Sequence, residues 1–102
     1  MVNKSRRRGT RLNLPVRLLV GAADFPVIDL SITGCAIRAP AELAKKSVIA
    51  ITLVVPLRDG DEHIATWAEP VRTSEDGRIG LKFRSLDVVD LALLKRLLDE
   101  IS

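Results

Sequence analysis

The sequence predicts an all-β fold: a closed six-stranded antiparallel β-barrel followed by a C-terminal amphipathic helix. Short apolar or alternating segments are separated by turn residues at intervals of about eight to twelve residues, which is typical of a barrel. After Ser85 the apolar period changes to three and four residues, which is typical of a helix. The 102 residues, 47% of them hydrophobic, are enough for one modest core.

The first two strands are expected before Gly34. The segment "LNLPVRLLV" (Leu12 to Val20) is apolar and rich enough in Leu and Val for a strand, and a proline near its start is tolerated at a sheet edge. The segment "FPVIDLSIT" (Phe25 to Thr33) alternates and predicts a half-buried strand. Its expected apolar face is Ile28, Leu30 and Ile32, and its expected polar face is Asp29, Ser31 and Thr33.

The middle strands follow a break at Gly34. "CAIRAP" resumes extended structure as far as Pro40, so a tight turn or a bulge is expected at the glycine. "AELAKKS" (Ala41 to Ser47) is a polar connection. "VIAITLVVPL" (Val48 to Leu57) is the most apolar run and favours a strand because β-branched residues dominate it.

The last two strands are bounded by clear turn residues. Asp59-Gly60 is expected to supply a hairpin turn, after which "HIATWAEPVRT" (His63 to Thr73) forms a strand. "SEDG" (Ser74 to Gly77) turns the chain again, and "RIGLKF" (Arg78 to Phe83) is the final strand.

The helix is predicted over Leu86 to Ile101. Ser85 can cap it, and Asp87 and Asp90 lie where acidic side chains favour a helix start. Its apolar stripe, expected to pack on the barrel or on a partner, is Val88, Leu91, Leu94, Leu98 and Ile101.

The excess positive charge of the chain lies at its front. Residues 1 to 23 contain six cations and no acid, while the remaining 79 residues hold the other 10 cations and all 13 anions and carry a net charge of −3. Such a run is often only a solvated tail, but a localised cluster also suits one anionic ligand better than an extended nucleic-acid backbone. We therefore divide the chain into a basic arm, residues 1–12, which we expect to be mobile when no ligand is bound, and a barrel with its helix, residues 13–102.

Several classes of function are disfavoured by composition. No run of 18 uncharged apolar residues exists, so membrane insertion is not expected, and the arginine-rich start has no apolar region of a secretory signal. A cytoplasmic protein is the expectation. Cys35 and His63 are the single cysteine and histidine, which disfavours a disulfide, a metal site, a cofactor and histidine-based catalysis, so we do not expect an enzyme.

Two motifs occur in order along this strand pattern. Arg7 and Arg11 form R-x-x-x-R, and "DLSITG" supplies D-x-S-x-x-G at Asp29, Ser31 and Gly34. With a late strand reading "GLKF" and a terminal helix, the chain resembles a PilZ domain over nearly its whole length. The resemblance implies a barrel of the split-barrel type that binds cyclic di-GMP and changes its surface for a downstream partner protein, without catalysis.

The chemistry of these residues agrees with that ligand. Arginine forks match guanine O6 and N7, pair with phosphate and stack on bases. The Asp29 carboxylate can accept hydrogen bonds from guanine N1–H and N2–H₂, and Ser31, two residues on, is expected on the same face. Gly34, without a Cβ, allows a sharp turn and a close backbone approach to ligand.

The residue before R-x-x-x-R bears on stoichiometry. In the family, an arginine at this position, here Arg6, accompanies recognition of two intercalated cyclic di-GMP molecules, so about two ligands per chain are implied. Arg8 is expected to add to the positive electrostatic field that attracts the anionic ligand. The predicted ligand-binding set is therefore Arg6, Arg7, Arg8, Arg11, Asp29, Ser31 and Gly34.

Other interpretations stay open from sequence. Asp29 and Ser31 also fit the wet side of an ordinary strand, and Trp67 fits either the core or the ligand site. The whole chain could be a PilZ-like interaction module without ligand, or a basic-arm nucleic-acid binder. The acidic body and the scarcity of aromatic residues disfavour the last, and no nucleic-acid partner is expected.

Overall fold

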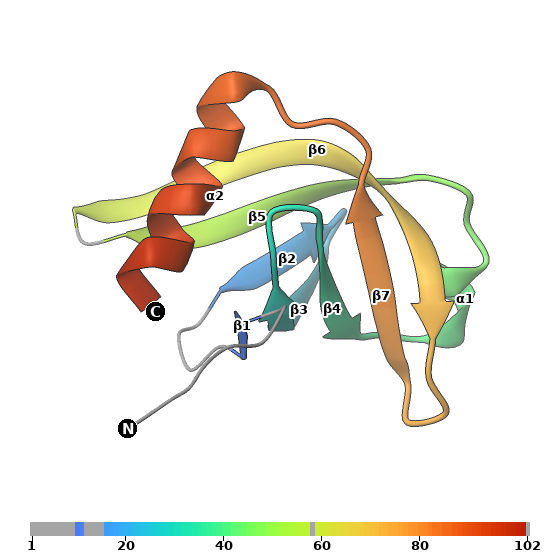
Figure 1. The fold of residues 1–102 in the computed structure, drawn as a ribbon. Coiled ribbons are helices and arrows are strands. Elements are labelled where there is room, and N and C mark those ends of the chain that lie inside the picture. Colours follow the sequence, from blue (N-terminus) through green and yellow to red (C-terminus); the bar gives the residue numbers. More distant parts are fainter. Residues whose placement is uncertain (1–9, 12–15, 58, 102) are drawn as a thin grey trace.

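The computed structural model describes residues 10–11, 16–57 and 59–101, and their strands close into an antiparallel barrel (Figure 1). Around the ring the order is β3, β2, β5, β6, β7 and β4, and pairing of β4 with β3 completes the closure. The predicted six-stranded barrel with a C-terminal helix is confirmed. The elements are β1 (Thr10–Arg11), β2 (Arg17–Val20), β3 (Ala23–Leu30), β4 (Gly34–Arg38), α1 (Ala41–Ala44), β5 (Ile49–Leu57), β6 (Gly60–Thr73), β7 (Arg78–Phe83) and α2 (Val88–Ile101).

The short strand β1 lies on the edge of β3 without opening the ring. β2 pairs with the first half of β3, and β1 pairs with its end, with Thr10 opposite Leu30 and Arg11 opposite Asp29. β4 occupies the other edge of β3. Residues 12–15, at the start of the first predicted strand, and residues 1–9 lie outside the described residues, so the mobile arm and its boundary at residue 12 stay predictions.

Alternation along the strands builds the core. In β5 every second residue from Ile49 to Leu57 is buried, and in β7 the buried residues are Ile79, Leu81 and Phe83. Each such side chain contributes about 1.5 to 3 kcal/mol when fully removed from water. The residues of β7 that alternate with these buried ones, among them Gly80 and Lys82, therefore point outward.

A β-bulge changes the expected faces of β3. Val27 pairs with Ile37 but Asp29 pairs with Ala36, so Ile28 is an extra residue in the ladder. The buried residues are consequently Val27 and Leu30, three apart, and Ile32 is 42% exposed beyond the end of the strand. Of the predicted apolar face, Leu30 is buried as expected, but the bulge gives the inward place of Ile28 to Val27, and Ile32 lies outside the strand.

The helix α2 begins two residues later than predicted. The Asp87 side chain accepts a hydrogen bond from the Asp90 amide at 2.8 Å, and its carbonyl accepts one from the Leu91 amide at 2.9 Å. Asp87, not Ser85, is therefore the N-cap. Leu94 and Leu97 are fully buried, whereas Val88, assigned to the buried stripe from sequence, is 83% exposed.

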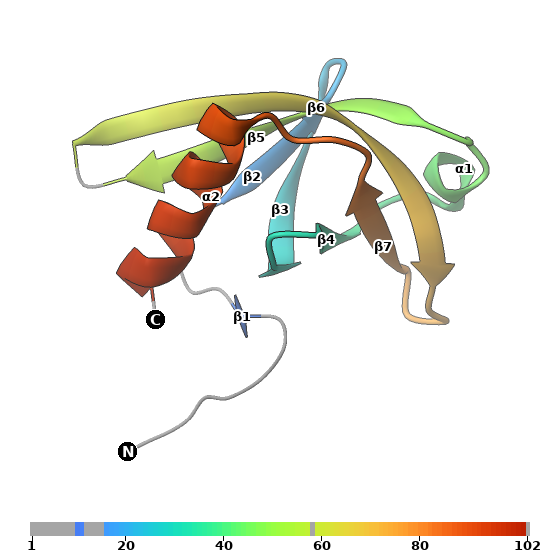
Figure 2. The same ribbon diagram turned by 45° about the horizontal axis from the view of Figure 1, so that its top comes forward.

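The helix and the β4–β7 wall lie on different sides of the barrel. α2 runs beside the β5–β6 hairpin, and the Arg96 guanidinium contacts the Asp59 carboxylate near the tip of that hairpin at 3.0 Å (Figure 2). The short helix α1, where the sequence predicted only a polar connection, joins β4 to β5. The outer face of β4 and β7 is thus left uncovered by either helix.

Candidate functional site

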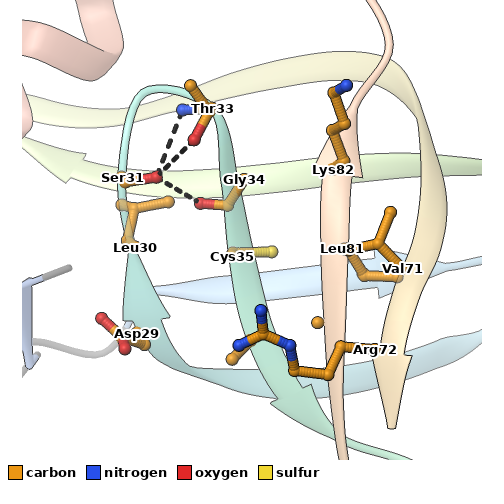
Figure 3. A pocket seen from close by; sticks show the side chains of 12 residues that line it. Asp29, Leu30, Ser31, Thr33, Gly34, Cys35, Val71, Arg72, Leu81 and Lys82 are labelled. Carbon is orange, nitrogen blue, oxygen red and sulfur yellow. Dashed lines mark hydrogen bonds between the residues drawn. The ribbon is translucent and has the colours of Figure 1, made fainter. Parts of the chain in front are cut away.

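A pocket of about 590 Å³ opens on the outer face of the barrel across β3, β4, β7 and β6 (Figure 3). Its floor lies where the outward positions carry little or no side chain: Gly34 and Ala36 on β4, and Gly80 on β7. The larger side chains stand at its two sides. The hollow therefore arises from small residues on two neighbouring strands, and its volume lies in the range of small-molecule sites.

One row of paired residues crosses five strands at this pocket. Arg11 of β1 lies opposite Asp29 of β3, Asp29 opposite Ala36, Ala36 opposite Gly80, and Gly80 opposite Arg72 of β6. Neighbouring strands are about 4.8 Å apart, so the backbones of Asp29 and Arg72 are separated by about 14 Å along the sheet. The row places an acid and a cation on opposite walls of the pocket.

Asp29 follows directly after the bulge in β3 and lines the pocket. Its Oδ1 is buried and has no hydrogen-bond partner within the described parts of the chain. A buried acceptor without a partner costs about 1 to 3 kcal/mol, so a donor brought to this oxygen would be bound favourably.

Ser31 organises the turn between β3 and β4. Its hydroxyl accepts a hydrogen bond from the Thr33 amide at 3.2 Å, lies 3.0 Å from the Thr33 hydroxyl, and donates to the Gly34 carbonyl at 3.4 Å (Figure 3). The Ser31 amide also donates to the Gly34 carbonyl at 2.9 Å. Ser31 therefore holds the corner of the pocket as well as lining it.

Gly34 is required by the packing of the two strands beneath the pocket. Its φ is not positive, so a left-handed turn is not the reason for glycine here. A Cβ on Gly34 would overlap the carbonyl oxygen of Leu81 and lie 3.2 Å from the Cα of Lys82. The expected turn does form over Ser31 to Gly34, but glycine is needed at its end because β7 approaches closely, not because of the turn conformation.

The opposite wall contains two cations that the sequence analysis did not single out. Arg72 and Lys82 both line the pocket, and neither makes a salt bridge within the described residues. A second bulge exposes this wall: Pro70 pairs with Leu81 and Arg72 with Gly80, so Val71 is extra. The sequence signal was Pro70 inside a strand, because proline interrupts the ladder and marks bulges.

The other predicted residues are distributed as follows. Arg6, Arg7 and Arg8 lie outside the described residues, and the backbone of Arg11 lies beside Asp29. Trp67 is 57% exposed and lines a second hollow with the start of α2, so it belongs neither to the core nor to the pocket around Asp29. Cys35 is buried, as expected for a small hydrophobe, and burial, with a smaller contribution from the Asp29 charge, raises the pKa of its thiol to about 12.

The sequence and the fold identify the family. The model of the PilZ domain matches residues 3–100. The chain belongs to the PilZ domain family. This PilZ domain resembles the PilZ domain of YcgR from Escherichia coli, whose structure contains c-di-GMP, with a TM-score of 0.62 and 20% identity over 95% of this chain and 92% of that one.

Two further solved structures share the fold. The Bacillus subtilis inhibitor of motility MotI/DgrA aligns with a TM-score of 0.69 and 18% identity over 95% of this PilZ domain, which spans only 52% of that protein. The PilZ domain of CeSA from a cellulose-synthesizing bacterium aligns with a TM-score of 0.63 and 19% identity over 92% of this chain and 97% of that one. No curated protein matches the sequence. None of the helices in the described residues is long and apolar enough to cross a membrane.

Proposed function

We propose that this PilZ domain is a cyclic di-GMP effector that changes its surface on binding and thereby regulates a partner protein in the bacterial cytoplasm. The observation that carries the proposal is that the D-x-S-x-x-G residues Asp29, Ser31 and Gly34 all line one pocket. The last residue of R-x-x-x-R, Arg11, pairs through its backbone with Asp29 at the edge of this pocket. Family membership and the c-di-GMP in the YcgR structure support it.

The proposed roles follow from the chemistry of the site. The Asp29 carboxylate, whose Oδ1 has no partner among the described residues, accepts hydrogen bonds from a guanine N1–H and N2–H₂. Arg7 and Arg11 bind phosphate and guanine edges through charge-assisted hydrogen bonds. Ser31 and Gly34 keep the corner in shape. No step of covalent chemistry is needed, so the domain acts as a receptor rather than an enzyme.

The arm is proposed to respond to ligand. Because β1 already pairs with β3, ordering of the arginines on the bound nucleotide would extend from an existing point of attachment. With Arg6 present, and Arg8 adding positive field, we propose about two cyclic di-GMP molecules per chain. Two stacked dinucleotides carry four phosphate charges, which a third guanidinium can meet.

Titration calorimetry tests the proposal, with cyclic di-GMP as ligand and with GTP and cyclic di-AMP as controls. Arg7→Ala and Arg11→Ala should each weaken cyclic di-GMP binding by about tenfold or more, because charge-assisted hydrogen bonds are lost, and both should melt like wild type. Arg6→Leu should lower the stoichiometry from two towards one. Wild-type affinity in both arginine variants would contradict the proposal. No binding by the wild type would favour a PilZ-like module that works without ligand.

A further inference from the structure

We propose that Arg72, assisted by Lys82, is a second phosphate-binding side of the ligand pocket, built into the barrel and independent of the basic arm. The inference rests on the proposed function and extends it to residues outside both motifs. It starts from the position of Arg72 at the far end of the paired row that begins at Arg11 and passes through Asp29.

The bulge in β6 presents Arg72 to the pocket. Adjacent residues of a regular strand point to opposite faces, yet Val71 and Arg72 both line this pocket, because Val71 is the extra residue of the bulge. Val71 is 58% exposed there. In Figure 3 the Arg72 side chain extends from β6 toward the wall that holds Asp29. An apolar surface and a guanidinium are thus offered together, which suits a nucleotide.

No acidic side chain among the described residues forms an ion pair with Arg72 or Lys82. Ion pairs hold Arg17, Arg38, Arg84 and Arg96 at other places on the surface, with donor–acceptor distances from 2.5 to 3.3 Å. Arg72 and Lys82 have no such partner among these residues, although both stand at a pocket. Lys82 lies opposite Gly34, one outward position along β7 from Gly80. Within the described parts of the chain, the far wall therefore carries unpaired positive charge next to the corner built by Ser31.

The polarity of the row fixes how a ligand would lie. From β3 to β6 it presents a carboxylate, two positions with little or no side chain at Ala36 and Gly80, and then a guanidinium. Phosphate is repelled by Asp29 and attracted by Arg72, whereas guanine N1–H and N2–H₂ match Asp29. A nucleotide with its guanine edge on Asp29 would lie over the small residues and direct a phosphate to Arg72.

The arm and the barrel would then hold the ligand from opposite sides. The arm joins the sheet through Arg11, beside Asp29, so a phosphate directed away from Asp29 meets Arg72 and Lys82 instead. Arg72 is the main contact because its planar fork can take two phosphate oxygens, and Lys82 acts as a point charge. The barrel itself thereby selects an anionic nucleotide.

Titration of the full chain with cyclic di-GMP at low and high salt tests the inference. Arg72→Gln should weaken binding about tenfold or more at low salt and less at high salt, since an exposed charge contact is screened. Arg72→Lys should lie between it and wild type, and Lys82→Gln should have a smaller effect. Lys95→Gln, which removes the same charge from an exposed position on α2, is the matched control and should bind like wild type.

The outcomes separate this inference from the proposed function. If Arg11→Ala is weakened but Arg72→Gln binds like wild type, the arm binds ligand and the second phosphate side is wrong. If Arg72→Gln loses binding only together with a lower melting temperature in the free protein, Arg72 supports the fold and the inference is also wrong. A wild-type chain that does not bind cyclic di-GMP would overturn both proposals.

Discussion

Replacing Gly34 by alanine should destabilise the barrel even though the backbone there has ordinary dihedral angles. The new Cβ would overlap the Leu81 carbonyl oxygen and approach the Lys82 Cα to 3.2 Å, so the obstacle is backbone rather than a movable side chain. Relief requires β4 to move away from β7 along a ladder that extends from Gly34–Lys82 to Arg38–Arg78. Overpacking of this kind costs about 1 to 3 kcal/mol.

The measurement is thermal unfolding without ligand. For a domain of this size 1 kcal/mol shifts Tm by about 4 to 8 °C, so a cost of about 2 kcal/mol predicts a decrease of about 10 °C. Gly80→Ala is the matched control on the facing strand, because the nearest atom to a Cβ there is the Arg72 Cβ at 3.5 Å, an ordinary contact. The control should melt within about 2 °C of wild type. Equal melting temperatures for the two variants would refute the steric argument, because they would show that β7 can move away from β4 at little cost in free energy.

Two further predictions concern the helix and the buried thiol. Leu94→Ala should cost about 2 to 5 kcal/mol in urea unfolding because its side chain is fully buried, whereas Val88→Ala, at a position 83% exposed, should leave the unfolding midpoint almost unchanged; similar losses would contradict the helix face described above. Burial, and to a smaller degree the Asp29 charge, raises the pKa of Cys35 from 9.0 to about 12, so the folded state holds the thiol proton more tightly than the unfolded state. The resulting stabilisation is complete below pH 9 and is lost as the pH rises towards 12. Between these pH values, the free energy of unfolding measured in urea should therefore fall less steeply for Cys35→Ala than for wild type. A decline of equal slope in both proteins would exclude Cys35 as its cause.

The sequence by itself determined the features that depend on local pattern. The apolar runs at residues 48–57 and 78–83 predicted strands, and β5 and β7 lie there; Gly77 closes the turn before Arg78, as the "SEDG" segment predicted. The motif residues Asp29, Ser31 and Gly34 were also identifiable, because their spacing is a property of the chain alone. The strand and turn predictions succeeded because apolar strand segments and turn residues are recognised from residues close in sequence.

Only the tertiary structure decided which residues face one another across the sheet. The bulge at Ile28 exchanged the buried positions of β3, and the bulge at Val71 turned Arg72 into the pocket. The need for glycine at position 34 comes from Leu81, a residue on another strand. Each of these facts depends on cross-strand register, and one extra residue in a ladder reverses the faces that a period of two predicts.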